Sequence, residues 1–314
     1  MTKVFIDGSE GTTGLRLASR LEKRQDIRLL EIDPALRKDE VERAKISNSA
    51  DVVFLCLPDQ AARNALAGIT NPEVKVIDTS TAHRVRDEWA YGLPELSPPH
   101  REKVSASKRI CVPGCHATGF SLLVYPLMAK GVAGVDYPLT AHSVTGYSGG
   151  GKQVIAAYSA PDRPSGYATP RQYALDQTHK HLPEMQKVSG LSHPPAFNPI
   201  IADFYSGMVV SVPLHLRLLK GKPTAQDLHS LLSEFYAGQE LIRVAEWGEA
   251  LPGGMLEPET LSGRDDLEIH VFGGGEHALL AARFDNLGKG ASCGAIQCMN
   301  LSMGLPESSG LLKG

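Results

Sequence analysis

Residues 4–17 read VFIDGSEGTTGLRL, an apolar run followed by three glycines and the start of a helical pattern. This order predicts a β-strand, a tight turn and an α-helix. Gly8 permits the tight turn, Gly11 permits close approach of the backbone to a pyrophosphate, and Gly14 permits close packing of the helix. The G-x-x-G-x-x-G spacing is weaker than G-x-G-x-x-G, so the strand–turn–helix context is what favours a dinucleotide site over a plain glycine-rich turn.

Beyond this turn, short β-rich runs alternate with helical stretches. We expect strands at 3–7, 27–32, 51–56 and 74–77, and helices at 12–23 and 60–66. Such alternation predicts parallel strands joined by crossover helices. The later runs are mostly continuous in apolar character, as in strands that are covered on both faces. The expected fold is therefore α/β, with a Rossmann-type doubly wound parallel sheet.

The pattern changes after residue 115. An apolar helix is expected to about residue 130, followed by longer strands at 139–145, 208–218, 267–272 and 278–284. These strands indicate an α+β domain with a mixed or antiparallel sheet. A Pro- and Gly-rich segment, 158–206, is too long for a simple connection, which indicates a functional or interface-forming role. The apolar helical pattern at 290–303 is expected to return to the first domain, so the expected domains are 1–114 completed by a C-terminal helix in 289–314, and 115–288.

Composition limits the classes of function. The 314 residues are 42% hydrophobic and 21% charged, with a formal net charge of -3 and a pI near 6.4. The basic residues are scattered, which argues against a nucleic-acid or membrane-surface partner. No apolar segment reaches the roughly 18 residues of a membrane span, and the chain starts directly in a strand-like run, so we expect a cytoplasmic protein.

The five cysteines are an odd number, which predicts reduced thiols rather than a disulfide framework. We expect no metal site, because Cys111 and Cys115 lack a second closely spaced pair.

One cysteine stands at a predicted helix start. Residues 112–125 read VPGCHATGFSLLVY, which places Cys115 just before an apolar helical run. A helix N-terminus presents unpaired N–H groups and a partial positive charge, which can lower a thiol pKa from about 8.5 toward neutrality. Cys115 is therefore a candidate nucleophile, and the alternative is a buried, inert cysteine.

A nucleophile of this kind needs a proton donor and an anion clamp. Residues 178–184 read THKHLPE and place His179, His181 and Glu184 beside a Pro-initiated helix. A histidine suits proton exchange near neutral pH, and the glutamate can fix a ring tautomer. The alternative is a solvated polar loop. For anion binding, the candidates are Arg84 and the loop at 143–152, SVTGYSGGGK, whose other possible role is that of a hinge.

The pyridine nucleotide is left open by the residues alone. Asp33 follows Gly14 by 19 residues, and an acid at this position normally accepts ribose hydroxyls and repels a 2′-phosphate, which favours NAD. Arg37 and Lys38 follow closely and offer a cradle for that phosphate, which favours NADP. The segment after residue 56 ends a later strand at the carboxyl edge of the sheet, where an open α/β sheet binds its ligand.

The sequence as a whole resembles the short, type 2 form of the N-acetyl-gamma-glutamyl-phosphate reductase family of arginine biosynthesis. The resemblance spans almost the whole chain. It is carried by residues 8–14 (GSEGTTG), 91–96 (YGLPEL), 113–118 (PGCHAT), the serine–glycine loop at Ser148, 179–184 (HKHLPE) and 286–292 (NLGKGAS). It implies NADP as cofactor and an α+β catalytic and oligomerisation domain after the Rossmann domain, as in aspartate-semialdehyde dehydrogenase and glyceraldehyde-3-phosphate dehydrogenase.

The resemblance also implies a reaction and residue roles. Such enzymes reduce N-acetyl-γ-glutamyl phosphate to N-acetylglutamate 5-semialdehyde and phosphate through a cysteine thioester, as homodimers or homotetramers. Cys115 would be the nucleophile, His179 the acid/base, and His181 and Glu184 orienting groups. Arg84, Ser148 and Gly149 would contact the small-molecule acyl phosphate. The cofactor-binding residues implied are Gly8, Ser9, Gly11, Thr12, Thr13, Gly14, Arg37, Lys38, Leu57, Pro58, Asn286 and Gly288.

Two departures and two alternatives accompany this interpretation. Cys293 stands where we expect a glycine, and Asp33 is unfavourable to NADP. A related acyl-phosphate reductase, such as aspartate-semialdehyde dehydrogenase, would share the mechanism, but those relatives surround their cysteine with Asn, Ser or Thr. A nucleotide-sensing protein in which Cys115 is a redox switch or a core residue is the alternative of another class.

Overall fold

The computed structural model describes residues 1–314 and divides the chain into two compact units. The first unit comprises residues 1–114 and 291–311, and the second comprises residues 115–290 and 312–314. The first unit has the predicted α/β fold and the second has the predicted α+β arrangement. No helix combines the length and apolar character needed to cross a membrane.

The first unit is built on a six-stranded sheet in which every pairing is parallel. The strand order is β2-β1-β3-β4-β6-β5. The chain therefore adds β2 on one side of β1 and the remaining strands on the other side. This confirms the Rossmann-type sheet. The strands are β1 (Thr2–Asp7), β2 (Ile27–Leu30), β3 (Val52–Leu55), β4 (Lys75–Asp78), β5 (Ala90–Tyr91) and β6 (Arg109–Cys111). The helices are α1 (Thr12–Leu21), α2 (Glu40–Ser49), α3 (Asp59–Ala67), α4 (Pro98–Ala106) and α9 (Cys293–Ser302).

Four of these elements were not expected from the sequence. Strands β5 and β6 have two and three residues, too few for a period-two pattern. Helix α2 has no apolar stripe, and its start is instead set by Asp39, whose side chain accepts from the N–H groups of Val41 and Glu42 at 2.9 Å. Helix α4 likewise begins at a capping residue, Ser97, rather than at an apolar pattern.

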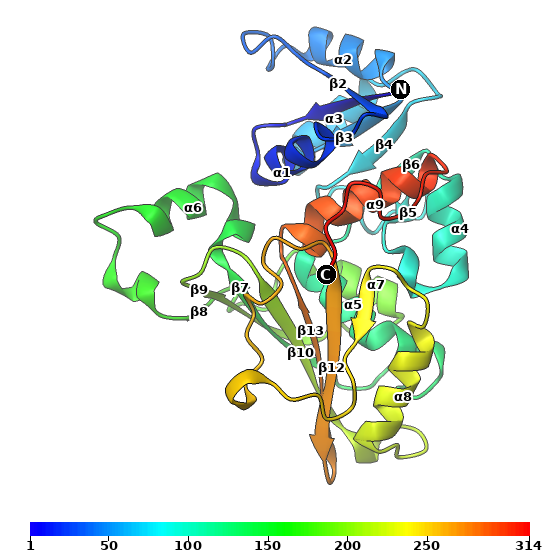
Figure 1. Ribbon diagram of the computed structural model, residues 1–314, viewed down its shortest axis with the longest axis vertical. Coiled ribbons are helices and arrows are strands. Elements are labelled where there is room, and N and C mark those ends of the chain that lie inside the picture. Colours follow the sequence, from blue (N-terminus) through cyan, green and yellow to red (C-terminus); the bar gives the residue numbers. More distant parts are fainter. The chain divides into compact units, whose positions relative to one another are not determined.

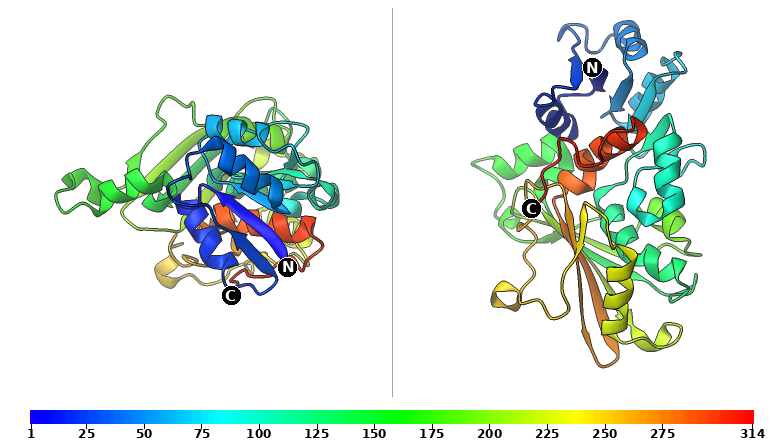
Figure 2. Two further views of the ribbon diagram at one scale, coloured as in Figure 1. Left: turned by 90° about the horizontal axis from the view of Figure 1, so that it is seen from above. Right: turned by 45° about the vertical axis from the view of Figure 1, so that its right-hand side comes forward.

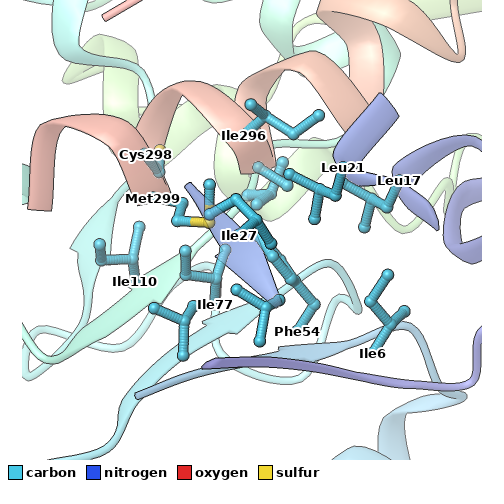
Figure 3. Packing of buried hydrophobic residues seen from close by; sticks show 14 of the residues in the cluster. Ile6, Leu17, Leu21, Ile27, Phe54, Ile77, Ile110, Ile296, Cys298 and Met299 are labelled. Carbon is cyan, nitrogen blue, oxygen red and sulfur yellow. The ribbon is translucent and has the colours of Figure 1, made fainter. Parts of the chain in front are cut away.

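Helix α9 contributes to the core of the first unit. Its residues Ile296, Cys298 and Met299 are fully buried. They pack in one cluster with Phe54 and Ile77 from the parallel strands (Figure 3). Burial of each such side chain contributes about 1.5–3 kcal/mol to folding, so the end of the chain is part of the first core rather than an appendage.

The second unit contains a mixed seven-stranded sheet of order β11-β12-β13-β10-β7-β9-β8 (Figure 1). The β7–β9 and β11–β12 pairs are parallel and the other four pairs are antiparallel, which confirms the predicted mixed sheet. The strands are β7 (Thr140–Gly146), β8 (Arg171–Gln172), β9 (Ala196–Ala202), β10 (Met208–His215), β11 (Ile242–Val244), β12 (Leu267–Gly274) and β13 (His277–Phe284). The helices are α5 (Cys115–Ala129), α6 (Gly151–Ser159), α7 (Leu182–Ser189) and α8 (Ala225–Phe235).

Helices α5 and α8 contact this sheet, α5 at β10 and β13 and α8 at β12 (Figure 2). A Cβ on Gly119 would lie 2.7 Å from the Val210 Cγ2, so glycine is what lets α5 approach β10 this closely. The N-terminal part of α5 is thereby fixed against the centre of the sheet.

One expectation for the second unit needs correction, and one segment contains strands that were not predicted. The strand predicted at 208–218 ends at His215, because Leu216–Leu218 turn into a short 3-10 helix. The segment at 158–206, for which no strand was predicted, contains helix α7 and strands β8 and β9, and these two strands form one edge of the sheet. Its proline and glycine residues obscured short elements that form only by pairing with strands elsewhere in the chain.

Candidate active site

Cys115 is the first residue of helix α5, as the sequence predicted. The thiol is half-buried and lies at the end of the helix where unpaired N–H groups favour a thiolate. The segment Gly288–Ser292, a turn of π-helix, packs against it. A Cβ on Gly290 would come within 2.7 Å of the Cys115 Cβ, so only glycine allows this approach.

A cluster of side chains surrounds this thiol. The Cys115 Sγ, a ring nitrogen of His116 and a ring nitrogen of His181 all lie within 4.8 Å of one another. His181 is buried at the N-terminus of α7, where Pro183 occupies the first turn. Of the two histidines predicted from the sequence, His181 is therefore the one grouped with the thiol.

His179 lies beside this group in a different environment. Its ring centroid is 4.6 Å from that of His181 and 5.3 Å from that of His116. Its Nδ1 accepts a hydrogen bond from the His181 backbone N–H at 3.1 Å. An acceptor nitrogen carries no proton, so this bond holds His179 as the Nε2–H tautomer and positions the backbone of its neighbour.

Glu184 is buried in the first turn of α7, with its Oε1 4.0 Å from the His181 Nε2. This separation exceeds a hydrogen bond. The structure thus places the Glu184 carboxylate next to the His181 ring.

His116 and Tyr173 are the site residues that sequence reasoning missed. The His116 Nδ1 lies 2.7 Å from the Ser143 Oγ, and its Nε2 lies 2.7 Å from the Tyr173 hydroxyl. Burial, together with the charges of His179 and Lys180, lowers the pKa of His116 to about 3, so the ring is neutral at pH 7. Adjacency to Cys115 was the only available signal, since the hydrogen-bond partners lie 27 and 57 residues away in the chain.

These ligand types are also those of a zinc site. Both ring nitrogens of His116, however, already have hydrogen-bond partners within the protein. The arrangement therefore favours proton transfer and nucleophilic chemistry at Cys115 over metal binding.

The loop that carries Tyr173, His179 and His181 is held in an unusual conformation. Ala174 and Gln177 have φ values of 49° and 58°, which non-glycine residues seldom adopt. The Gln177 amide fixes the loop to β9, since its Nε2 donates to the Phe197 carbonyl at 2.8 Å and its Oε1 accepts from the Phe197 N–H at 2.9 Å. Strain of this kind collects at functional sites, where the surrounding contacts maintain it.

A second group in this unit joins three residues that the resemblance had selected. Ser148 is fully buried, and its hydroxyl accepts from the Asn286 Nδ2 at 3.0 Å. The Asn286 Oδ1 in turn accepts from the Gly207 N–H at 2.8 Å. A Cβ on Gly149 would lie 3.0 Å from the same Asn286 amide. Gly288 follows in a turn closed by Asp285, whose Oδ1 accepts the Gly288 N–H at 3.1 Å.

In the first unit, the glycine turn joins β1 to α1 as predicted. Gly8 has a φ of 91°, and a Cβ there would lie 2.4 Å from the Cys56 carbonyl oxygen. A Cβ on Gly14 would lie 2.4 Å from the Gly8 oxygen, so helix packing requires that glycine. At Gly11 the nearest atom is 3.4 Å from such a Cβ, and no side chain caps the N-terminus of α1. The chain itself therefore leaves space at Gly11 and leaves the helix start open.

The remaining residues selected for the nucleotide lie around this turn. Ser9, Thr12 and Thr13 are half-buried in it, and Leu57 and Pro58 lead from β3 into α3. Arg37 and Lys38 are exposed in the turn after β2, where Arg37 forms an ion pair with Glu10. The Asp33 Oδ1 accepts the Ala35 N–H at 2.9 Å.

Arg84 has a clear structural anchorage in the first unit. Its Nε donates to the Val112 carbonyl at 2.9 Å and its Nη2 donates to the Thr79 carbonyl at 3.0 Å. These bonds tie together the two segments that follow β4 and β6.

The other four cysteines differ from Cys115 in setting. Cys111, Cys293 and Cys298 are buried, and burial of the Cys56 sulfur raises its pKa to about 12. The five thiols are free of disulfide bonds in this structure.

Comparisons with known proteins match the whole chain. The sequence pattern of the family described as semialdehyde dehydrogenase, NAD binding domain, matches residues 3–104, and that of the semialdehyde dehydrogenase dimerisation domain matches residues 115–286. A protein of a Nostoc species named N-acetyl-gamma-glutamyl-phosphate reductase 2 is 43% identical over 98% of this chain and 99% of its own. A Pseudomonas putida protein of the same name is 44% identical over 98% of each chain.

Solved structures share the fold at low sequence identity. Aspartate semialdehyde dehydrogenase II from Vibrio cholerae, complexed with ASA, has a TM-score of 0.72 at 14% identity, covering 96% of this chain and 98% of that one. Aspartate semialdehyde dehydrogenase with NADP from Candida albicans has a TM-score of 0.67 at 15% identity, over the same shares.

Proposed function

The chain belongs to the N-acetyl-gamma-glutamyl-phosphate reductase family, and we propose from its site that it reduces N-acetyl-γ-glutamyl phosphate to N-acetylglutamate 5-semialdehyde and phosphate in arginine biosynthesis. The observation that carries this proposal is the Cys115 sulfur at the start of α5, within 4.8 Å of a nitrogen of His181. A thiolate beside an imidazole is the nucleophile that acyl transfer requires.

In this mechanism the chain acts first as a nucleophile. The Cys115 thiolate attacks the acyl carbon, the carbon–oxygen bond to phosphate breaks, and phosphate leaves with the electron pair. The product is a thioester on Cys115. When bound, NADPH supplies the hydride that takes this acyl group to the aldehyde level.

We assign proton transfer to His181 rather than to His179, which the family resemblance had implied. His181 is grouped with the sulfur, and the Glu184 carboxylate lies 4.0 Å from its Nε2. The Nδ1 of His179 is occupied by a backbone hydrogen bond, which suits a positioning role. His181 takes the proton of the thiol and returns a proton to the departing oxygen.

The glycine turn of the first unit fits the pyrophosphate of NADP. The space at Gly11 and the uncapped helix start offer backbone N–H groups to an anion without an intervening side chain. The nucleotide would be held there by Gly8, Ser9, Thr12, Thr13 and Gly14, flanked by Leu57 and Pro58. Arg37 and Lys38 would meet the 2′-phosphate, with Asn286 and Gly288 near the nicotinamide.

Substrate binding and assembly complete the proposal. Ser148 and Gly149 would bind the acyl phosphate or carboxylate of the substrate, and Arg84 would contribute charge from the segment that it anchors. The match to a dimerisation domain supports a homodimer or homotetramer. We place this enzyme in the cytoplasm, with small molecules as its only ligands.

The test is a steady-state assay in the reverse direction. Purified protein is supplied with N-acetylglutamate semialdehyde, phosphate and either NADP or NAD, and reduced nucleotide is followed by absorbance. We expect turnover with NADP that requires phosphate and is lost after alkylation of Cys115. Aspartate semialdehyde is the control substrate, and an equal or higher kcat/KM for it would replace the proposed substrate.

A further inference from the structure

Three side chains next to the nucleophile form a hydrogen-bonded chain across the second unit. Ser143 on β7 meets the Nδ1 of His116, and the Nε2 of His116 meets the hydroxyl of Tyr173, both at 2.7 Å. Ser143 is fully buried and His116 is 3% exposed. Each of these bonds needs one donor and one acceptor, so the position of one proton determines that of the next.

The direction of the chain follows from the difference in burial between its two ends. His116 is the only hydrogen-bond partner of the Ser143 hydroxyl, and a fully buried hydroxyl proton without an acceptor would cost about 1–3 kcal/mol. Ser143 therefore donates and the His116 Nδ1 accepts, whereas Tyr173 is only half-buried and can present its proton to a ligand. Because His116 is neutral, its single proton is on Nε2, which donates to the oxygen of Tyr173.

This leaves the proton of the Tyr173 hydroxyl without an acceptor in the protein, since the bond from His116 is the only one its side chain makes. The oxygen of Tyr173 is occupied as an acceptor, and its O–H is available as a donor. Burial and the charge of the Cys115 thiolate raise the pKa of Tyr173, so the phenol keeps this proton at neutral pH.

We propose that Tyr173 donates this hydrogen bond to the carbonyl oxygen of the acyl group attacked by Cys115, with His116 and Ser143 as the positioning residues that aim it. A donor held in place before the reaction stabilises the charge that develops on that oxygen as sulfur adds to the carbon. The inference deepens the proposed function, since it rests on Cys115 being the acylated residue.

Two reactions of the same thiol separate this role from a structural one. Acetylation by p-nitrophenyl acetate passes through an oxyanion: the sulfur bonds to the carbonyl carbon and p-nitrophenolate leaves with the electron pair. Alkylation by iodoacetamide displaces iodide at a saturated carbon and forms no oxyanion. We expect Tyr173→Phe to slow the acetylation burst by about 10²-fold, with the alkylation rate within about two-fold of wild type.

One control variant and two possible results decide whether the inference about Tyr173 holds. Tyr205→Phe removes a half-exposed tyrosine hydroxyl and is expected to change neither rate. Unchanged acetylation in Tyr173→Phe would overturn the inference, and so would an equal fall in both rates, which would mean that Tyr173 acts on the sulfur or on the fold.

The positioning residues are tested with two substitutions of His116 and a double-mutant cycle with Tyr173. His116→Gln retains an N–H near the position of Nε2 and is expected to keep acetylation within about ten-fold of wild type, whereas His116→Leu should lose as much as Tyr173→Phe. In the His116→Leu/Tyr173→Phe double variant we expect no further loss, because both changes remove one interaction. Additive losses would refute the positioning role. Ser143→Ala removes the donor that holds the His116 proton on Nε2. Its acetylation rate is expected to lie between those of the two His116 variants.

This design keeps two failures apart. If wild-type protein does not turn over the acyl phosphate, the proposed function fails, but the acetylation and alkylation rates still report on Tyr173. If turnover is normal and Tyr173→Phe acetylates at the wild-type rate, only the inference about Tyr173 fails.

Discussion

The second unit contains two buried clusters of titratable side chains that are built in opposite ways. Around Glu268 on β12, the charges are matched across neighbouring strands: Arg283 Nη2 lies 2.5 Å and Arg243 Nη2 lies 2.9 Å from its carboxylate oxygens. Burial alone would raise the pKa of Glu268, but His270, whose Nε2 lies 3.6 Å away, and hydrogen bonds from Arg283 and Arg243 outweigh it and hold that pKa well below its usual range.

The cluster around Cys115, by contrast, contains polar groups that are not paired with an opposite charge. His116 is neutral, and the hydroxyl of Tyr173 has a proton to give. A cluster whose charges are fully paired contributes to the fold, whereas one that leaves a donor or a nucleophile open can act on a ligand. Substitutions in the two clusters should therefore separate activity from stability.

The largest effect is expected at the nucleophile. Cys115→Ser should lower kcat by roughly 10⁴-fold or more, because a serine hydroxyl beside the same imidazole is a far weaker nucleophile than a thiolate. Steady-state kinetics with the semialdehyde, phosphate and NADP measures the change. An unaltered thermal unfolding midpoint shows that only chemistry was removed, and wild-type turnover in this variant would remove the basis of the mechanism.

The next effect distinguishes the two histidines. His181→Asn should lose about 10²–10⁴-fold in kcat, because proton transfer to and from the reacting groups is lost. His179→Asn, the matched control, should lose about ten-fold at most. The reverse order of the two losses would restore His179 as the acid/base.

The paired cluster should respond in stability and not in rate. Glu268→Gln leaves the buried Arg283 without a carboxylate partner, while the half-exposed Arg243 keeps Glu249, and is expected to lower the free energy of unfolding by about 3–5 kcal/mol. Urea unfolding measures this change, and kcat at a temperature where the variant is folded should stay near wild type. Glu276→Gln, on the exposed β12–β13 turn, is the control and should change stability by less than about 0.5 kcal/mol.

The smallest effect is a pH dependence of stability. The folded-state pKa of His116 is about 3, against 6.5 for an unperturbed histidine. Between these values the unfolded chain binds a proton that the folded chain does not, so stability is present above about pH 6.5 and is lost as pH falls. From pH 7 to 5 this one group should cost about 2 kcal/mol. Urea unfolding at both pH values measures this change, which should be smaller by about 2 kcal/mol in His116→Gln than in the wild type. If the two proteins lose the same free energy of unfolding between pH 7 and pH 5, His116 is protonated in the folded state and the prediction is wrong.

The sequence predicted the parts of the fold that depend on local signals. The glycine turn, the start of α5 at Cys115 and the Pro-initiated α7 each follow from a few adjacent residues. The returning helix α9 was visible from its apolar pattern. Strands β5 and β6 were not, because two or three residues form a strand only when partners from elsewhere are already in place.

The same distinction between local signals and distant contacts applies to the residues of the candidate site. Cys115, His181 and Glu184 stood out because their residue types and spacing suit acyl transfer. Tyr173 did not, because its significance comes from His116, which is 57 residues distant in the chain. Which of two nearby histidines faces the sulfur is likewise decided by the path of the backbone through Ala174 and Gln177, and no residue pattern reports that path.

The position of α9 has a consequence for the order in which the polypeptide can fold during synthesis. Ile296, Cys298 and Met299 fill the first core, yet they leave the ribosome long after the strands against which they pack. The first unit cannot complete its core until residues 293–302 have been synthesised, while residues 115–290 are already available to collapse. A nascent chain arrested near residue 290 should therefore expose the apolar surface around Phe54 and Ile77 and be a substrate for chaperones.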